Sequence, residues 1–151
     1  MRIGVLSDTH MHSAEEIPPE ILKTFPNMDL IVHAGDFVSS AVLEGLKRLG
    51  EVKAVHGNVD SMKLRSLLPD KELLVVGGKK IGITHGWGGP EGIEQRVKGL
   101  FDDVDIIIYG HSHRAKIGQI GNILFFNPGP GQQSFGILTI AQDVQGEIVK
   151  V

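Results

Sequence analysis

The chain has 151 residues, of which 41% are hydrophobic and 22% charged, with a formal net charge of −3 and no cysteine. This length fits one domain around one buried core, so we expect a single domain spanning 1–151. The charge argues against a protein that binds nucleic acid by charge alone, and the lack of cysteine excludes disulfides, Fe–S clusters, zinc fingers and a thiol nucleophile. No apolar stretch approaches the roughly 18 residues of a membrane span, and the opening residues are strand-like rather than a signal peptide, so we expect a cytoplasmic protein.

The first sixty residues alternate between predicted strands and predicted helices. Three apolar runs are predicted to be buried strands: 3–6, 30–32 and 52–55. The helix expected between the first two has an apolar stripe of Ile17, Ile21, Leu22 and Phe25. A second helix is capped by Ser39 or Ser40, ends at a left-handed Gly50, and has a stripe of Val42, Leu43, Leu46 and Leu49. Such strand–helix–strand units predict parallel strands with right-handed crossovers.

The remainder of the chain contains more strands than helices. Residues 61–79, including 64–68, are predicted as short extended pieces and a hairpin that leads into a strand at 80–85. A third helix is expected over 90–101, with Ile93, Val97, Leu100 and Phe101 facing inward. Further strands are predicted at 106–109, 115–120, 122–126, 134–141 and 146–151. We expect an α/β domain with a parallel and an antiparallel half, in which two sheets pack face to face between helices.

Five of the predicted strand ends are followed by side chains that can bind a metal. These side chains are Asp8, His10, Asp36, Asn58, His85, His111 and His113. Loops at the carboxyl ends of strands in α/β sheets converge on one crevice, so we expect the seven to meet in space. The residues of each local pair, Asp8 with His10 and His111 with His113, would face the same way in an extended backbone. Seven nitrogen and oxygen ligands exceed the needs of one ion, so the pattern predicts a site for two metals.

The same residues form five sequence blocks. The blocks read Asp8-x-His10, Gly35-Asp36, Gly57-Asn58-x-Asp60, His85 and Gly110-His111-x-His113. In this order they resemble the signature blocks of the calcineurin-like metallophosphoesterases. The Ser7-Asp8-Thr9-His10 opening and Asn127-Pro128-Gly129 are similar to the short, single-domain phosphodiesterase branch of that family. The resemblance implies the metallophosphoesterase fold, a four-layer α/β/β/α sandwich of two mixed sheets, and hydrolysis of a small phosphodiester.

The resemblance also implies a role for each ligand. It assigns Asp8, His10 and His113 to one metal and Asn58, His85 and His111 to the other, with Asp36 bridging the two. It gives the second set, Asn58, His85 and His111, a catalytic role as well. Such ligands suit manganese, our first expectation, or nickel, cobalt, iron or zinc, better than calcium. A water shared by two such ions ionises near neutral pH and can attack a phosphoryl group.

The chain departs from the family pattern at Val59. Many family members carry a histidine at this position, which protonates the leaving oxygen, and valine cannot donate a proton. We therefore expect a preference for leaving groups that need little protonation. In an alternating backbone Asp60 would face away from Val59, and we interpret it either as an acid or as a residue that supports a turn or a ligand.

A few further residues have two interpretations each. His12, two residues past His10, and Arg114, next to His113, are candidates for substrate contacts, although both are also compatible with an ordinary surface role, which is favoured for His12. His33 either orients the bridging aspartate or is a buried histidine with its own hydrogen bonds. His56 is expected at a buried strand end without a direct role. The segment 127–129 either faces the substrate or forms an ordinary turn.

Three functions remain compatible with the sequence. The first is a dinuclear metal-dependent phosphodiesterase, and the second is a phosphomonoesterase or nucleotidase with the same metals, which Val59 argues against. The third is a non-catalytic scaffold similar to a subunit of the retromer sorting coat, on the same fold. A scaffold is under no demand to keep metal ligands, and this chain has all seven. No membrane partner is expected, and a homo-oligomer is compatible with the sequence.

Overall fold

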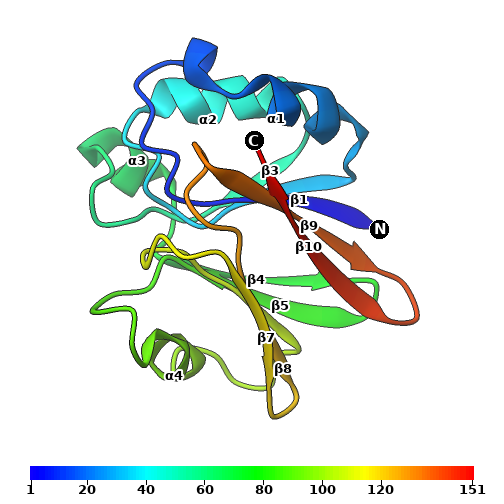
Figure 1. Cartoon of the computed structure of the whole chain (residues 1–151). Coiled ribbons are helices and arrows are strands. Elements are labelled where there is room, and N and C mark those ends of the chain that lie inside the picture. The colour runs from blue at the N-terminus through cyan, green and yellow to red at the C-terminus, as the bar shows by residue number, and fades with distance from the viewer.

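The computed structural model describes residues 1–151 and contains two five-stranded sheets with helices on their outer faces (Figure 1). Helices α1 (Pro19–Thr24) and α2 (Ser40–Lys47) cover one sheet, and α4 (Ile93–Lys98) covers the other. Short 3-10 turns η1 (Ala14–Glu16) and η2 (Phe25–Asn27) flank α1. The layers therefore follow the order α/β/β/α, and the predicted fold class is confirmed.

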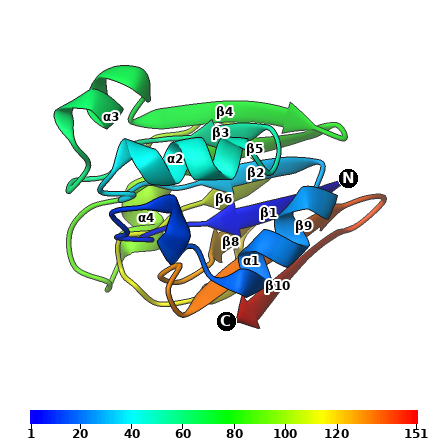
Figure 2. The same ribbon diagram turned by 90° about the horizontal axis from the view of Figure 1, so that it is seen from above.

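The first sheet is built from the two ends of the chain. Its strands, in spatial order, are β10 (Val144–Lys150), β9 (Ser134–Ile140), β1 (Arg2–Leu6), β2 (Leu30–His33) and β3 (Val52–Ala54). The strands β1, β2 and β3 are parallel, as the two crossover helices require, and β9 and β10 add antiparallel pairs at the other edge. Figure 2 shows α1 and α2 lying over this sheet.

The second sheet comes from the middle of the chain. Its strands, in spatial order, are β4 (Lys71–Val76), β5 (Lys79–Thr84), β6 (Ile106–Ile108), β8 (Ile123–Asn127) and β7 (Lys116–Ile120). The strands β5, β6 and β8 are parallel, while β4 and β7 are antiparallel edges. Parallel pairs thus occur in both sheets, and the prediction of one parallel and one antiparallel half was wrong. Each sheet is mixed because hairpins add antiparallel edges to a parallel centre.

Three apolar clusters hold the four layers together. One of them joins the two sheets and includes Val5 and Val32 from the first and Ile83, Ile108 and Phe126 from the second. A second cluster packs α1 and α2 on the first sheet, and a third packs α4 on the second. The central strands are buried on both faces, which explains why they appear in the sequence as unbroken apolar runs.

Two predicted segments differ from the structure, one in type and one in length. Residues 64–68, predicted as extended, lie largely in helix α3 (Met62–Leu67), where the hydroxyl of Ser61 accepts a hydrogen bond from the Leu64 amide at 3.3 Å. Because Leu64 is the only buried residue of this short helix, no apolar period marks it. The helix expected over 90–101 is limited to α4, which begins after Gly92 in a left-handed conformation (φ 78°).

The first two helices differ from prediction in smaller ways. Leu22 is 44% exposed, because the single core-facing position of α1 is Ile21. Ser39 caps α2 by accepting a hydrogen bond from the Ala41 amide at 3.2 Å, as one of the two predicted alternatives. Gly50 is not left-handed, since α2 ends at Arg48 with an ordinary helical φ of −70°.

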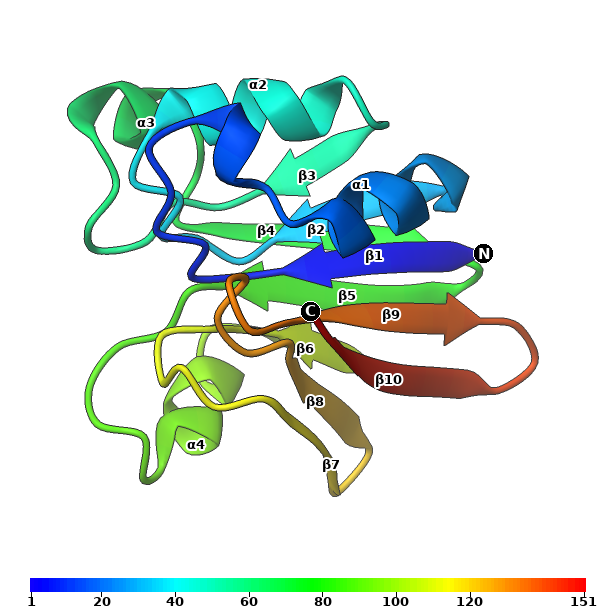
Figure 3. The ribbon, with the colours of Figure 1, turned by 45° about the horizontal axis from the view of Figure 1, so that its top comes forward.

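The strand directions bring five loops to one side of the molecule. In Figure 3 the arrowheads of β1, β3, β5 and β6 point to the same side, where the chain leaves each strand. All predicted metal ligands follow the strands β1, β2, β3, β5 and β6 on this side. Among the helices, none has the length and apolar character needed to cross a membrane.

Candidate metal centre

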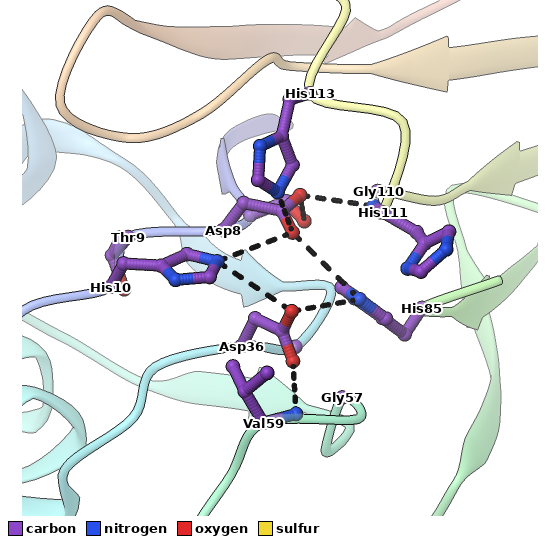
Figure 4. A network of polar contacts seen from close by, with 12 residues as sticks. Asp8, Thr9, His10, Asp36, Gly57, Val59, His85, Gly110, His111 and His113 are labelled. Atoms are coloured by element: carbon purple, nitrogen blue, oxygen red, sulfur yellow. Dashed lines mark hydrogen bonds and ion pairs between the residues drawn. The ribbon is translucent and has the colours of Figure 1, made fainter. Parts of the chain in front are cut away.

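Five of the seven predicted ligands converge on one small volume (Figure 4). Asp8, His10 and His113 form one group whose ligand atoms lie within 4.8 Å of one another, and Asp8, Asp36 and His85 form a second such group. Asp8 Oδ1 lies 3.3 Å from His113 Nε2, 3.7 Å from His85 Nε2 and 3.9 Å from His10 Nε2. The first group is the same set that the family resemblance assigns to one metal.

The carboxylate of Asp36 faces one histidine from each of the two predicted ligand sets. Its Oδ2 atom is 3.6 Å from His10 Nε2 and 3.1 Å from His85 Nε2, two histidines assigned to different ions. Its Oδ1 atom accepts a hydrogen bond from the Val59 amide at 3.0 Å. One oxygen is therefore fixed by the backbone, while the other faces both sets of ligands, as a bridging ligand requires.

Three buried polar atoms at this position have no hydrogen-bond partner: Asp8 Oδ1, His10 Nε2 and His85 Nε2. Buried polar groups are nearly always paired, so three unpaired atoms facing one another need an explanation. Metal ions satisfy such atoms, and the donor set of imidazole nitrogen and carboxylate oxygen is the kind that transition metals prefer. The residues present therefore fit divalent metal ions.

His85 is prepared for metal binding by the hydrogen bond on its other ring nitrogen. Its Nδ1 lies 2.8 Å from the carbonyl oxygen of Ala34, which can only accept, so Nδ1 carries the proton and Nε2 faces the carboxylates. Burial lowers the pKa of His85, but the adjacent Asp36 and Asp8 outweigh this and leave it raised. Burial alone would raise the pKa of Asp36. His85 and the Val59 amide lower it by more, so the pKa is below its ordinary value and the carboxylate stays ionised.

The backbone at the ligands is strained. Seven non-glycine residues of the chain have a positive φ, and five of them are predicted ligands: Asp8, His10, Asp36, His111 and His113. This left-handed conformation costs most residues on the order of 1–3 kcal/mol and clusters at functional sites. The prediction that each local pair converges through an extended backbone was wrong, because left-handed turns aim these side chains.

Two glycines allow the loops to approach the carboxylates. A Cβ atom at Gly57 would lie 2.0 Å from Asp36 Oδ1, and one at Gly110 would lie 1.8 Å from Ser7 Oγ and 2.6 Å from Asp8 Oδ2. Neither position can hold a side chain unless the carboxylate moves. The glycines of the third and fifth sequence blocks are therefore part of the site.

The other two predicted ligands, His111 and Asn58, lie beside this centre. The His111 ring packs edge-on against the His85 ring, with centroids 5.2 Å apart. The backbone amide of His111 donates to Asp8 Oδ2 at 3.0 Å. Asn58 is exposed in the turn after β3, where it lines a pocket together with His85. Both side chains are on the side of the centre assigned to the second ion.

A family model described as a calcineurin-like phosphoesterase superfamily domain matches residues 1–142. The chain belongs to this superfamily. A probable metallophosphoesterase of Methanocaldococcus jannaschii is 40% identical over 133 residues, which cover 85% of this chain and 67% of that protein. A phosphodiesterase of the same organism is 32% identical, with 99% of each chain covered. These members place the chain among the metal-dependent phosphoric ester hydrolases.

Solved structures agree with this assignment. Wild-type Vps29 of Entamoeba histolytica, complexed with Zn²⁺, matches with a TM-score of 0.76 and 26% identity over 99% of each chain. That protein binds a divalent ion on the same fold, and the present chain has groups of side chains that could hold such an ion.

Asp60 supports the centre through the backbone. It is buried, and its carboxylate accepts hydrogen bonds from the amides of Gly57 (2.7 Å), Val38 (2.8 Å) and Asp36 (3.0 Å). The bonds from Val38 and Asp36 join the loop after β2 to the loop after β3, and the bond from Gly57 lies within the loop after β3. Of the two interpretations of Asp60, the geometry favours the supporting one over the acid, because its oxygens are engaged by backbone donors.

His33 supports the same loops from the core. Burial and the nearby His85 hold its pKa well below the ordinary value, so the ring is neutral. Its Nδ1 accepts from the Gly35 amide at 3.0 Å, which leaves Nε2 to donate to Thr9 Oγ1 at 3.1 Å, and Phe37 stacks on the ring. His33 thus has satisfied bonds of its own and also links the first two ligand loops, so its two interpretations both hold in part.

Two supporting residues were not identified by their local sequence. The hydroxyl of Ser7 donates to Asp8 Oδ2 at 2.6 Å. Asn127 donates from Nδ2 to Ser112 Oγ at 3.0 Å and to the Gly110 carbonyl at 3.4 Å, while its Oδ1 accepts from the Gly129 amide. The Asn127 turn therefore fixes the loop that carries His111 and His113. In the sequence, only the resemblance of Asn127-Pro128-Gly129 to a family motif pointed to this turn.

The remaining candidates lie around the centre. His12 is exposed and lines a pocket of about 480 Å³ together with His10. The side chain of Arg114 is 66% exposed and forms an ion pair with Glu91 at 3.7 Å in a different pocket, which contains none of the seven ligands. His56 is half-buried and lines the pocket of Asn58. A substrate contact thus stays a prediction for His12 and is less favoured for Arg114.

Proposed function

We propose that the chain is a dinuclear metal-dependent phosphodiesterase. The observation that supports this most strongly is the set of buried, unpaired ligand atoms around Asp36, whose free oxygen faces His10 on one side and His85 on the other. One ion would be held by Asp8, His10 and His113, and the other by Asn58, His85 and His111. Manganese is our first choice, and nickel, cobalt, iron and zinc fit the same donors.

Each residue of the centre would have its own role in hydrolysis. When bound, the two ions supply an activated water and positive charge against the phosphoryl oxygens. Asp36 holds the two ligand sets at a fixed separation, and the hydrogen bonds on Asp8 and His85 fix the orientation of their metal-binding atoms. We propose that Asn58, His85 and His111 act in catalysis by holding the second ion beside the bound ester.

The pockets on the two sides of the centre favour a diester. One, of about 480 Å³, is lined by His10 and His12, and the other, of about 290 Å³, by Asn58 and His85. A phosphodiester has two organic groups, and each could occupy one pocket while the phosphoryl group lies between them. A monoester would leave one pocket unused. A small phosphodiester is therefore the proposed substrate.

Metal content tests this proposal first. Reconstituted protein should contain two divalent transition-metal ions per chain, and a chelator should remove both the ions and the hydrolysis of aryl phosphodiesters. Elemental analysis and rate measurements on the same samples provide the readout. One ion or none per chain, with activity unchanged by the chelator, would contradict the proposal.

A second prediction concerns the leaving group. Val59 is 45% exposed beside Asp36 and offers no proton to a departing oxygen. The rate should therefore fall steeply as the leaving group becomes less acidic, so aryl esters should react readily and alkyl esters slowly. Val59→His should flatten this dependence and raise the rate for poor leaving groups by about 10²-fold. The ratio of monoester to diester hydrolysis should rise in the same variant.

Val59→Phe is the matched control, because it introduces a ring of similar size without a proton donor. It should keep the steep dependence of the rate on leaving-group pKa. If the wild-type rate did not depend on leaving-group pKa, another residue would already supply the proton, and the role given to Val59 would be wrong.

The non-catalytic scaffold considered from the sequence is the other candidate, and the chain shares its fold with Vps29. The same experiments separate the two, since a scaffold would bind metal without hydrolysing any ester. A phosphomonoesterase or nucleotidase would instead prefer monoesters over diesters. A cytoplasmic location and a homo-oligomeric state stay predictions.

A further inference from the structure

The pocket beside Asn58 and His85 has one wall that the metal centre does not explain. It is lined by Trp87 and Leu100 in addition to the polar side chains of Arg65 and Lys71. Trp87 is the only tryptophan of the chain and is 48% exposed, two residues after His85. A half-exposed indole that lines a pocket beside the candidate ligands offers a flat apolar face on which a ligand can stack.

The loop that carries Trp87 is held in place by one side chain. Arg96 in α4 donates hydrogen bonds to the carbonyl oxygens of Trp87 at 2.8 Å and of Glu91 at 3.1 Å, and also to that of Gly89. A guanidinium that engages three carbonyls of one loop fixes its path. Trp87 is thus presented on a preformed loop, and little entropy is lost when a ligand packs against it.

The pocket also carries positive charge. Arg65 donates to the carbonyl oxygens of Asn58 at 2.6 Å and Asp60 at 3.2 Å, which places its guanidinium against the turn that holds Asn58. Lys71 donates to the Leu100 carbonyl at 3.2 Å and so lies beside the apolar wall. Asp70 is the one acidic lining residue besides these two cations. The pocket therefore combines an aromatic face with a surplus of positive charge.

We propose that this pocket binds an aromatic ring carried by a phosphate ester, an aryl group or a nucleobase, which stacks on Trp87. The position of the phosphoryl group next to Asn58 and His85 rests on the proposed function. The stacking itself does not, because it requires only the loop and the indole. Stacking of a base on an aromatic side chain is sequence-tolerant, so we expect selection for an aromatic group rather than for one base.

Trp87 provides its own probe, since it is the only tryptophan. Adenosine monophosphate should quench its fluorescence in a saturable way, in both metal-free and metal-loaded protein. Ribose 5-phosphate, which has the same phosphate and sugar without the base, should bind about tenfold more weakly. In calorimetry, Trp87→Leu should lose about tenfold in affinity for adenosine monophosphate and show no change for ribose 5-phosphate.

Met62→Ala is the matched control, because Met62 is an exposed apolar residue of α3 that does not line the pocket. It should leave both affinities unchanged. Equal affinity for the two ligands, no saturable quenching, or an unchanged affinity in Trp87→Leu would overturn the inference. Quenching by adenosine monophosphate in a protein that hydrolyses no diester would support the aromatic pocket while contradicting the proposed function.

Discussion

Replacing Asp36 by asparagine should lower turnover by on the order of 10³-fold, because it removes charge from the carboxylate that the proposed centre assigns to both ions. Asp36 Oδ2 lies 3.6 Å from His10 Nε2 and 3.1 Å from His85 Nε2. Metal content should fall for both ions, since each loses an anionic ligand. The rate against an aryl phosphodiester and the metal content of the purified variant are the measurements.

The fold should survive this substitution. Asparagine keeps an oxygen that can accept the Val59 amide, and the core clusters lie among the strands and helices. His10→Ala is the comparison, because His10 belongs to one ion only and its loss should have a smaller effect. If Asp36→Asn kept near-normal turnover and metal content, the bridging assignment would be wrong.

Asp60→Ala should have the largest effect on stability. It leaves three backbone amides, those of Asp36, Val38 and Gly57, without an acceptor in a largely buried position. Each unsatisfied donor costs about 1–3 kcal/mol, which gives about 3–9 kcal/mol for three. The Val38 bond is only partly buried, so the free energy of unfolding should fall by an amount at the lower end, about 3–5 kcal/mol. Denaturant unfolding of the metal-free protein measures this directly, without a contribution from bound metal.

Asp60→Asn distinguishes support from proton donation. The asparagine oxygen can still accept from the two amides that share Oδ2, so this variant should lose only about 1–3 kcal/mol. Its activity per folded, metal-loaded molecule should stay close to normal. If Asp60 were the general acid, activity would instead fall sharply at unchanged stability and metal content.

The positions of the ligands could be predicted because the signals are local. Each of the residues Asp8, Asp36 and His85 follows an apolar run, and a run that is buried on both faces is recognisable without knowledge of its neighbours. Parallel strands then bring the loops to one edge regardless of the details of packing. The sequence therefore predicted the layers and the convergence of five of the seven candidate ligands.

The conformation and support of the ligands could not be predicted in the same way. Asp8 and His113 have positive φ, and although aspartate and histidine adopt this conformation more often than most residues, nothing in the local sequence marks which of them will do so. The bonds from Asp60 to the loop after β2 span more than twenty residues, and that from Gln132 to the carbonyl of His10 spans more than a hundred. Helix α3 was missed for a related reason, since it has a single buried residue and therefore no period.

Anomalous diffraction from crystals of the manganese-loaded protein tests the central claim most directly. Two peaks per chain are expected, about 3.5–4 Å apart, with Asp36 between them. One peak should contact Asp8, His10 and His113, and the other Asn58, His85 and His111. A single peak, or two peaks that do not share Asp36, would contradict the dinuclear centre.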